Sequence, residues 1–218
     1  MERNPEVVVL FRTTEKKNKN PKVKPEWVSN INCLHWLKET SKDIEINVFG
    51  DQIKKPELYK TYGKFIEVKH HGNSESFLET LEYALTLPSE TIVYFCEDDY
   101  MHRDGWVTAV KEGLERADYV SLYDHPDKYT GNPEVLFHTE STHWKYTHST
   151  TMTFATKVKT LAFDERVFKE FITTGNPPDH HIFLELRKLG RRLATPIPGY
   201  STHGESALLS PVIDWRKL

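Results

Sequence analysis

Three consecutive carboxylates, Glu97, Asp98 and Asp99, follow the apolar run 91–96. That run is rich in β-branched and aromatic residues, a composition that predicts a buried strand. Three acids at the tip of a strand repel one another, and oxygen ligands of this kind suit Mg²⁺ or Mn²⁺. We therefore expect a divalent cation at these acids, with an acidic turn that only caps the next segment as the alternative.

Two other expected strands also lead into polar side chains. The strand at 7–11 is followed by Arg12 and Thr13, and the strand at 44–49 is followed, after one glycine, by Asp51. Ligands of an open parallel sheet bind at the carboxyl ends of its strands. Beside a metal, an arginine and a hydroxyl suit a nucleotide diphosphate, and an aspartate can accept hydrogen bonds from a base or a ribose. A surface ion pair for Arg12 and a simple turn for Asp51 are the alternatives.

The segment 72–76, Gly-Asn-Ser-Glu-Ser, precedes an amphipathic helical pattern that ends at 83–85. Gly72 permits close approach of the backbone to a ligand, and Asn73 or Ser74 can cap the helix. Capping alone explains the pattern, and a helix start that faces a nucleotide is the other interpretation.

The order of the expected elements predicts the fold class. Strands alternate with helical patterns through the first 123 residues, and this rhythm predicts an α/β fold with a mostly parallel central sheet flanked by helices. The second half begins with a polar stretch, 124–150, that suits a surface hairpin or loop, and it ends in a turn-rich tail, 196–205. Strands are expected at 7–11, 44–49, 65–68, 91–96, 119–123 and 150–155, and helices at 27–37, 76–85, 106–114, 164–172 and 178–189.

The composition narrows the class of protein. With 38% hydrophobic residues, a chain of 218 residues can bury one core, and we expect a single domain. The net charge of −3 and the scattered basic residues argue against a nucleic-acid-binding protein. Only the stretch 15–24 is locally basic, and it suits a mobile loop or a contact with a phosphate-bearing ligand. No apolar run approaches the ~20 residues of a membrane span, and the first residues are not a signal peptide, so we expect a soluble cytoplasmic protein.

The order of these motifs resembles the core of nucleotide-sugar-dependent glycosyltransferases of the GT-A fold, of the family-2 kind. In that family a glycine-containing turn and a helix lead into a strand that carries an Asp-x-Asp motif, and here the turn 72–76 and its helix lead into the strand and acids of 92–99. The chain departs from the motif, since Glu-Asp-Asp stands where Asp-x-Asp is usual. The resemblance implies one GT-A-like, Rossmann-like domain, with a nucleotide-sugar-binding half at about 1–123 and an elaborated acceptor and catalytic half at about 124–218.

The resemblance also implies roles for individual residues. Asp99 would be the direct metal ligand, Glu97 could ligate the metal or a metal-bound water, and His203 of the tail would complete the metal site. Asp179 would be the general base that deprotonates the acceptor hydroxyl, which gives inversion at the anomeric carbon. An N-cap is the alternative for Asp179, and a tail histidine without a function is the alternative for His203. The residues expected to contact the donor are Phe11, Arg12, Thr13, Asp51, Asn73, Ser76, Glu97 and Asp98.

Polar and aromatic side chains in 124–150 mark where we expect the acceptor to bind. Aromatic faces stack on sugar rings, so Trp144 is a candidate, together with Asp124 and His125. Packing in the core or burial at an interface explains Trp144 equally well.

These expectations combine into one predicted function. The chain would transfer a sugar from a nucleotide diphosphate sugar, with a UDP-sugar favoured, to a hydroxyl of a glycan or glycoconjugate, and Mn²⁺ or Mg²⁺ would bridge the diphosphate. Two alternatives stay open. The string Asp179-His180-His181 also occurs in DHH-type metal-dependent phosphoesterases, although here it follows two prolines. A catalytically inactive nucleotide-sugar-binding protein would explain the imperfect acidic motif.

Overall fold

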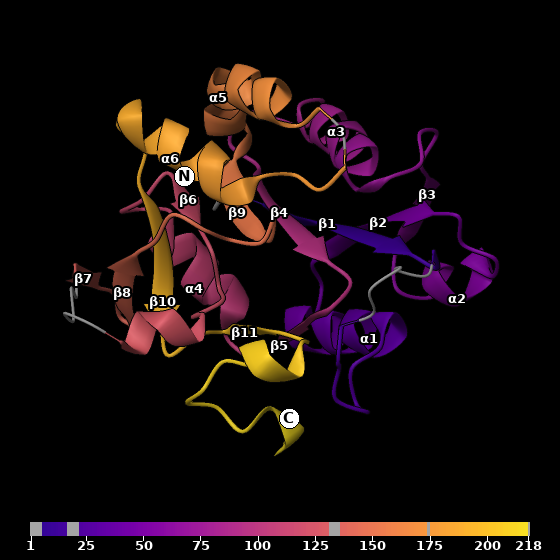
Figure 1. The fold of residues 1–218 in the computed structure, drawn as a ribbon, viewed down its shortest axis with the longest axis horizontal. Helices are drawn as coiled ribbons and strands as arrows, with labels where there is room; N and C mark the ends of the chain where they lie inside the picture. The colour runs from indigo at the N-terminus through magenta and orange to yellow at the C-terminus, as the bar shows by residue number, and fades with distance from the viewer. Residues whose placement is uncertain (1–5, 17–21, 131–135, 174, 218) are drawn as a thin grey trace.

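The computed structural model describes residues 6–16, 22–130, 136–173 and 175–217. Its main feature is a nine-stranded sheet in the order β3-β2-β1-β4-β9-β6-β10-β8-β7 (Figure 1). Strands β3, β2, β1 and β4 run parallel, as do β6 and β10, whereas β7, β8 and β9 pair antiparallel with their neighbours. The strands are β1 (Val7–Thr14), β2 (Glu45–Asp51), β3 (Lys64–Glu67), β4 (Ile92–Glu97), β6 (Tyr119–Val120), β7 (Phe137–His138), β8 (His143–Tyr146), β9 (Phe154–Lys157) and β10 (Leu193–Ile197).

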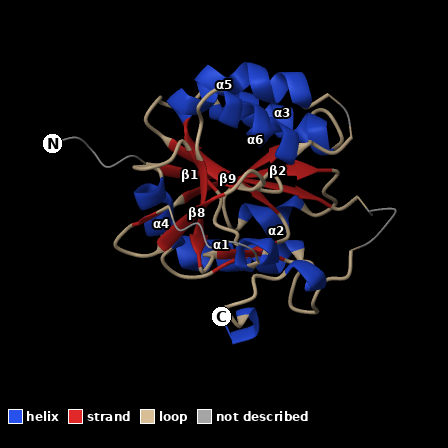
Figure 2. Cartoon of the chain, turned by 60° about the vertical axis from the view of Figure 1, so that its left-hand side comes forward, coloured by secondary structure: helices blue, strands red, loops and turns tan. Residues whose placement is uncertain are grey.

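Helices cover both faces of this sheet (Figure 2). One layer consists of α3 (Asn73–Ala84), α5 (Val158–Phe171) and α6 (Asp179–Lys188). The opposite layer consists of α1 (Asn30–Ser41), α2 (Pro56–Lys60) and α4 (Trp106–Gly113). A second, two-stranded sheet joins β5 (Tyr100–His102) to β11 (Ser201–His203). The α/β fold class predicted from the sequence is therefore confirmed.

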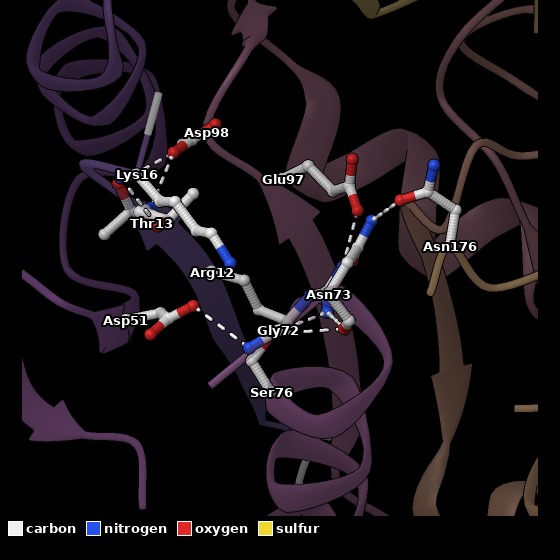
Figure 3. Close-up of a pocket in the computed structure, with 11 residues that line it drawn as sticks. Arg12, Thr13, Lys16, Asp51, Gly72, Asn73, Ser76, Glu97, Asp98 and Asn176 are labelled. Atoms are coloured by element: carbon white, nitrogen blue, oxygen red, sulfur yellow. Dashed lines mark hydrogen bonds and ion pairs between the residues drawn. The ribbon is translucent and has the colours of Figure 1, made fainter. Parts of the chain in front are cut away.

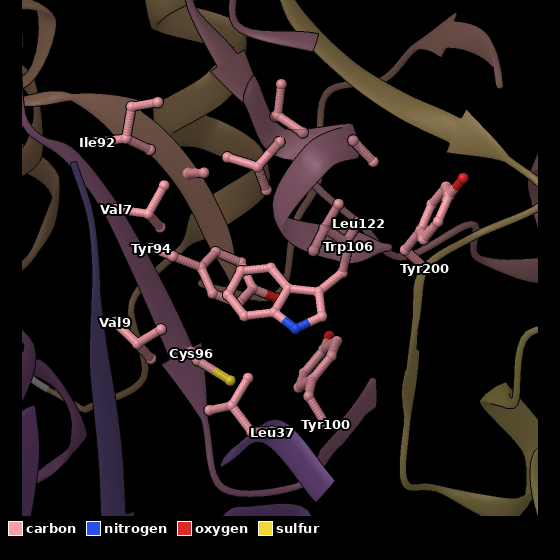
Figure 4. Packing of buried hydrophobic residues seen from close by; sticks show 14 of the residues in the cluster. Val7, Val9, Leu37, Ile92, Tyr94, Cys96, Tyr100, Trp106, Leu122 and Tyr200 are labelled. Atoms are coloured by element: carbon pink, nitrogen blue, oxygen red, sulfur yellow. The ribbon is translucent and has the colours of Figure 1, made fainter. Parts of the chain in front are cut away.

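Each face of the central sheet has its own hydrophobic core, because successive side chains of a strand point to opposite faces. In β1, Phe11 packs in the core beneath α1 and α4, and Leu10 packs in the core beneath α3 and α5. In the first core, Trp106 of α4 lies against Tyr94 of β4 with ring centroids 5.1 Å apart (Figure 4). The central strands are thus held from both sides, which fixes the position of their ends.

Parallel pairing brings three polar strand ends to one edge of the sheet. Arg12 of β1 lies opposite Glu97 of β4, and Thr14 of β1 lies opposite Asp51 of β2. The carboxyl ends of β1, β2 and β4 therefore meet, as the alternation of strands and helices predicts.

One expected strand begins later than its sequence indicates. A strand is expected at 150–155, but β9 begins only at Phe154. Thr151 and Met152 adopt left-handed backbone conformations, with φ of 49° and 60°, which an extended strand does not contain. The segment before β9 is consequently a tight turn.

The tail expected to be turn-rich contains the end of β10 and all of β11. In β11, His203 lies opposite Tyr100 of β5. The residues of this short strand are Ser, Thr and His, so no alternation of apolar side chains indicates a strand in the sequence.

Two further boundaries differ from the expected ones. The strand expected at 119–123 ends at Val120, because the carbonyl of Leu122 accepts hydrogen bonds from the tail instead of continuing the ladder. Helix α5 begins at Val158, six residues before the expected start of the helix at 164–172.

Within the described ranges, no helix combines the length and apolar character needed to cross a bilayer. Parts of three predictions lie outside these ranges: residues 1–5 of the start of the chain, 17–21 of the basic stretch, and 131–135 of the expected loop.

Candidate functional site

A cavity of about 370 Å³ opens at the carboxyl ends of β1, β2 and β4 (Figure 3). The start of α3 and the loop that precedes α6 complete its wall. The lining residues are Arg12, Thr13, Thr14, Lys16, Asp51, Gly72, Asn73, Ser76, Glu97, Asp98 and Asn176. Seven of the eight residues expected to contact a donor are in this group; the eighth, Phe11, is not.

Arg12 holds this cavity together. It is 6% exposed, and its guanidinium donates hydrogen bonds to the carbonyl of Asn73 at 2.9 Å, to the Asn73 side-chain oxygen at 3.0 Å and to the Ser76 hydroxyl at 3.3 Å. It also forms a salt bridge with Glu97. Burial raises the pKa of Glu97, and the charge of Arg12 opposes that rise. Arg12 therefore ties β1, the start of α3 and the end of β4 into one unit.

Asp98 lies on the side of the cavity next to α1. Its Oδ2 accepts hydrogen bonds from the Thr13 hydroxyl at 2.8 Å, the Thr14 N–H at 3.1 Å and the Asn30 amide at 2.7 Å. Burial and the adjacent Asp99 carboxylate raise the pKa of Asp98 to about 7. Two residues expected to contact the donor, Thr13 and Asp98, thus bind each other.

Asp51 connects β2 to the turn before α3. It is 5% exposed, its Oδ1 is 2.7 Å from His71 Nδ1, and its Oδ2 accepts a hydrogen bond from the Gly72 N–H at 3.2 Å. Gly72 has a φ of 135°, and a Cβ at this position would lie 2.2 Å from the Glu75 carboxylate. Only glycine fits this turn without strain, and the turn brings the start of α3 to the cavity.

Two lining residues come from loops. Lys16 belongs to the basic stretch for which the sequence suggests a phosphate contact, and its side chain extends into the cavity in Figure 3. Asn176, for which the sequence gives no functional signal, accepts a hydrogen bond of 3.2 Å at its side-chain oxygen from the Asn73 amide, across a sequence separation of 103 residues. No spacing in the sequence could indicate that contact, because only the fold brings these two loops together.

Asp99 and His203 lie side by side because β5 pairs with β11. Asp99 Oδ2 is 3.4 Å from His203 Nε2, and the two residues are 8% and 2% exposed. Within the described part of the chain, Asp99 Oδ1 and His203 Nδ1 are buried without a hydrogen-bond partner. Such atoms are uncommon in folded proteins, so each of the two side chains has one polar atom that no described residue satisfies.

Two lysines of the basic stretch reach the same pair. Lys24 Nζ is 3.2 Å from Asp99 Oδ2, and Lys22 Nζ is 3.4 Å from His203 Nε2. Burial acts to raise the pKa of Asp99, but the hydrogen bond and charge of His203 and the charges of Lys24 and Lys22 outweigh it and hold this pKa below its ordinary value. The Asp99 carboxylate is therefore charged and compensated at neutral pH.

This pair could hold a divalent cation only together with ligands from outside the chain, such as phosphate oxygens and waters. Asp99 offers an oxygen ligand and His203 a nitrogen ligand, while Glu97 and Asp98 already have partners in the chain. Among the described residues, no group of three or more His, Cys, Asp and Glu side chains is arranged to hold a metal alone. Mg²⁺ commonly uses one or two carboxylates together with substrate phosphates and waters, which matches a two-residue site of this kind.

Asp179, the candidate base, is the first residue of α6 and anchors the turn before β9. Its Oδ2 accepts hydrogen bonds from the Ser149 hydroxyl at 2.8 Å, the Thr150 N–H at 2.8 Å and the Thr151 N–H at 2.7 Å. Its Oδ1 forms no hydrogen bond with the described residues. One oxygen of the carboxylate is therefore fixed, and the other can bind a ligand.

The same turn links Asp179 to the acidic end of β4. The Glu97 N–H donates a hydrogen bond of 3.2 Å to the Thr153 hydroxyl, and the Tyr100 hydroxyl bonds to the Thr151 hydroxyl. The candidate base and the acidic strand end are thus connected through the few residues from Thr151 to Thr153.

Two expected site residues lie in the core instead. Phe11 is fully buried beneath α1 and α4, so its side chain cannot contact a donor. Trp144 is also fully buried; its ring stacks on Phe137 at a centroid distance of 5.8 Å, and its Nε1 donates to the Thr139 hydroxyl at 2.9 Å. Stacking of Trp144 on an acceptor sugar is therefore wrong, and the alternative of core packing describes it.

Asp124 and His125 differ in their access to a ligand. Asp124 is fully buried, bonds to the Tyr129 hydroxyl, and has a pKa raised by burial, so an acceptor cannot reach its carboxylate in this arrangement. The side chain of His125 is 39% exposed and lies 3.0 Å from the Asp127 carboxylate. Of the three residues expected to bind the acceptor, only His125 is accessible.

Comparisons with known proteins bear on the fold. No protein-family model matches the chain, and no curated protein matches its sequence. The structure of GalNAc-T7 with UDP, GalNAc and Mn²⁺ aligns with a TM-score of 0.65 at 11% identity, over 93% of this chain and 44% of that one. CMP:2-keto-3-deoxy-manno-octonic acid synthetase complexed with CTP aligns with a TM-score of 0.54 at 12% identity, over 87% and 88% of the two chains.

A third solved structure is similar over nearly its whole length. The 4-diphosphocytidyl-2C-methyl-D-erythritol synthase of Anaerococcus prevotii aligns with a TM-score of 0.54 at 11% identity, over 97% of this chain and 94% of that one. At such identities the likeness concerns the fold, which this chain shares with a protein crystallised with UDP and with one crystallised with CTP.

Proposed function

We propose that the chain is a glycosyltransferase that moves a sugar from a nucleotide diphosphate sugar to a hydroxyl group of a glycan or glycoconjugate. The observation that carries this proposal is the cavity at the strand ends, with Asp99 and His203 paired beside its acidic wall. The likeness in fold to a protein whose structure holds UDP, GalNAc and Mn²⁺ supports it. A UDP-sugar is the donor we favour.

The N-terminal half, about 1–123, would bind the donor. Asp51 and Asp98 are hydrogen-bond acceptors suited to a base or ribose, and Lys16 brings a positive charge for the diphosphate. Arg12 and Asn73 would shape this site, since the two terminal nitrogens of Arg12 donate hydrogen bonds to Asn73, Ser76 and Glu97.

Asp99 and His203 would hold Mn²⁺ or Mg²⁺ together with the diphosphate. The bound ion would neutralise the negative charge that develops on the diphosphate leaving group. Lys22 and Lys24 now lie on this pair, so they would move away from it and could then contact the phosphates.

Asp179 would act as the general base. Because its Oδ2 is fixed by three hydrogen bonds, its free Oδ1 is held in one orientation and can accept the proton of an acceptor hydroxyl. The acceptor oxygen then forms a bond to the anomeric carbon as the bond from that carbon to the diphosphate breaks, and the nucleoside diphosphate leaves. A single displacement of this kind inverts the anomeric configuration. The half at about 124–218 would bind the acceptor.

Nucleotidyl transfer is the second candidate function, favoured by the two synthetases that this chain matches over 88% and 94% of their length. In that reaction Lys16, Lys22 and Lys24 would bind the phosphates of a nucleoside triphosphate. The phosphoesterase alternative has no comparable support. Asp179 is engaged by the turn before β9, and the ring of His180 lies 4.8 Å from that of His148 rather than in a cluster of acids.

Calorimetry with UDP, GDP, dTDP and CTP, each with Mn²⁺ or with EDTA, tests the proposal. We expect one nucleoside diphosphate to bind in a metal-dependent manner, and Asp99→Asn to weaken that binding at least tenfold. The exposed Asp104→Asn is a control of the same charge change and should leave binding unaltered. Absence of nucleotide binding under every condition contradicts the proposal.

Product analysis then separates the alternatives. Release of a nucleoside diphosphate from its sugar, with a new glycosidic bond, supports glycosyl transfer. Release of pyrophosphate from CTP supports nucleotidyl transfer, and binding without turnover supports an inactive nucleotide-sugar-binding protein.

A further inference from the structure

A second cavity, of about 530 Å³, lies between α6 and the part of the sheet that contains β6, β8 and β10. Its floor is apolar and consists of Tyr119, Phe183, Leu186 and Leu193, which are at most 5% exposed. The function proposed above uses none of these residues. A cavity of this size can accommodate a ligand of several non-hydrogen atoms with an apolar or sugar-like body.

The rim of this cavity is strongly basic. It carries Lys128, Lys145, Arg187, Arg191 and Arg192, against the single carboxylate of Asp127. An excess of positive charge around a concave, partly apolar surface raises the local concentration of anions.

Several of these cations lack an anionic partner. Lys128 is paired with Asp127 at 2.6 Å, and Arg191 is paired with Asp164 at 2.8 Å. Arg187 and Arg192, by contrast, form no salt bridge within the described part of the chain. Arg192 Nη1 donates a hydrogen bond to the Tyr146 hydroxyl at 3.4 Å, but neither guanidinium has a carboxylate partner among the described residues, so both can bind phosphate or carboxylate oxygens.

The positive charge of the rim also acts on His148, which lines the cavity. Burial lowers the pKa of His148, and the nearby His180, Lys128 and Arg187 lower it further. A proton on His148 is thus disfavoured by the positive field of the rim, as an anion would be favoured.

The cavity adjoins the acceptor side of the candidate base. Arg187 follows Asp179 by eight residues on α6, which corresponds to about 12 Å along the helix. His148 directly precedes Ser149, whose hydroxyl binds Asp179, and the His148 ring contacts His180 with centroids 4.8 Å apart. A molecule that presents a hydroxyl to Asp179 could therefore extend along α6 into this cavity.

We propose that this cavity binds a phosphate or carboxylate group of an anionic acceptor, through Arg187 and Arg192, while another part of the same molecule presents its hydroxyl to Asp179. The role as acceptor site rests on the proposed function; the binding of an organic anion does not. The apolar floor would hold the body of the ligand, and the two arginines would select for its charge.

The anionic dye 8-anilinonaphthalene-1-sulfonate is the first probe, since it combines an apolar body with one negative charge. Fluorescence titration should show a site that weakens at least tenfold in Arg187→Glu/Arg192→Glu, and that weakens when NaCl is raised from about 50 mM to about 500 mM. Lys60→Glu/Lys64→Glu, with the same charge change at exposed positions on α2 and β3, should leave the site unaltered. The neutral dye N-phenyl-1-naphthylamine should not distinguish the variants.

Competition identifies the chemistry of the ligand. Maltotriose 6-phosphate and trigalacturonate should displace the anionic dye, and neutral maltotriose should not; the stronger of the two competitors decides between phosphate and carboxylate. Equal dye affinity in wild type and Arg187→Glu/Arg192→Glu, or displacement by neutral maltotriose alone, overturns the proposal.

Binding of UDP, measured on the same proteins, separates this proposal from the proposed function. The arginine variant should bind UDP as the wild type does. If the wild type binds the sugar anions but no nucleotide, the anion site stands and the transferase proposal fails. If the wild type binds UDP but replacing the two arginines does not change dye binding, the proposed anion site fails and the transferase proposal stands.

Discussion

Replacing Asp179 separates its two roles, as an anchor of the turn before β9 and as a base. Three hydrogen bonds converge on Oδ2, and the turn they hold contains Thr151 and Met152 in left-handed conformations. Asp179→Ala removes all three bonds and leaves two backbone N–H groups without their acceptor. Asp179→Asn keeps a side-chain oxygen in the same position but has no basic oxygen.

The magnitudes follow from the hydrogen bonds. At about 1–1.5 kcal/mol for each bond of this half-buried carboxylate, Asp179→Ala should lower the free energy of unfolding by about 3–4 kcal/mol. Bonds to a neutral oxygen are roughly half as strong, so Asp179→Asn should lower it by about 1–2 kcal/mol. For a chain of this length these losses correspond to a decrease in Tm of about 8–14 °C for the alanine variant and about 3–6 °C for the asparagine variant.

The loss of turnover should not follow the loss of stability of the two variants. Loss of a general base lowers the rate by about 10²–10⁴-fold, and Asp179→Asn should show this full loss although it loses less stability than Asp179→Ala. Three assays measure these effects: thermal unfolding, calorimetric binding of the nucleoside diphosphate, and release of that nucleotide as its sugar is transferred to water or to an added saccharide. Donor affinity of the asparagine variant should stay within about twofold of the wild type.

Two results would refute this reasoning. If Asp179→Asn retains more than a tenth of the wild-type turnover, Asp179 is an anchor and not a base. If the asparagine and alanine variants lose the same stability, the hydrogen bonds to Ser149, Thr150 and Thr151 do not hold the turn as described.

Three further changes test other parts of the structure. Trp144→Ala should lower the free energy of unfolding by about 3–5 kcal/mol in urea titrations, as for a large core side chain; a loss under about 1 kcal/mol contradicts its burial. Burial lowers the pKa of His102 from 6.5 to about 3. At pH values between 3 and 6.5, His102 therefore binds a proton in the unfolded chain but not in the folded chain. Between pH 7 and pH 5 the wild type should therefore lose about 2 kcal/mol relative to His102→Gln, which keeps an acceptor for Tyr94; parallel pH profiles contradict this. Lys24→Gln removes the ammonium 3.2 Å from Asp99 and should strengthen binding of Mn²⁺ alone about tenfold, measured by electron paramagnetic resonance; unchanged or weaker binding shows that Lys24 does not compete for the site.

The sheet edge could be predicted because it depends on local patterns. The apolar run before Glu97 and the alternation of strands with helices are both visible in the sequence, and parallel strands necessarily bring their carboxyl ends to one edge. The contacts inside the cavity could not be predicted in the same way. Arg12 binds Asn73 and Glu97, and these contacts depend on how α3 packs against β1 and on the burial that follows.

Trp144 shows how a polar neighbourhood can mislead. It lies in a stretch rich in His, Thr and Pro that suggests a surface loop, yet Phe137 and Gly113 cover its ring; a Cβ on Gly113 would come 2.6 Å from that ring. The alternation in His143-Trp144-Lys145-Tyr146 is the signal of a half-buried strand, and it is too short to decide against the surrounding composition.

The acids at the end of β4 and the basic stretch near the start of the chain are each visible in the sequence, but their contact is not. Lys24 Nζ lies 3.2 Å from Asp99 Oδ2, so its ammonium relieves part of the repulsion among the acids. The electrostatic energy between two unit charges about 4 Å apart is roughly 4 kcal/mol near a protein surface, and it doubles when one of the charges is divalent. Between an ammonium group and a divalent cation this energy is repulsive. The Lys24 ammonium therefore opposes binding of a divalent cation at Asp99. A nucleotide diphosphate bound with its metal ion, as proposed above, would bring negative charge to which Lys22 and Lys24 can move. We therefore expect occupation of the proposed metal site to be coupled to movement of these lysines onto the phosphates.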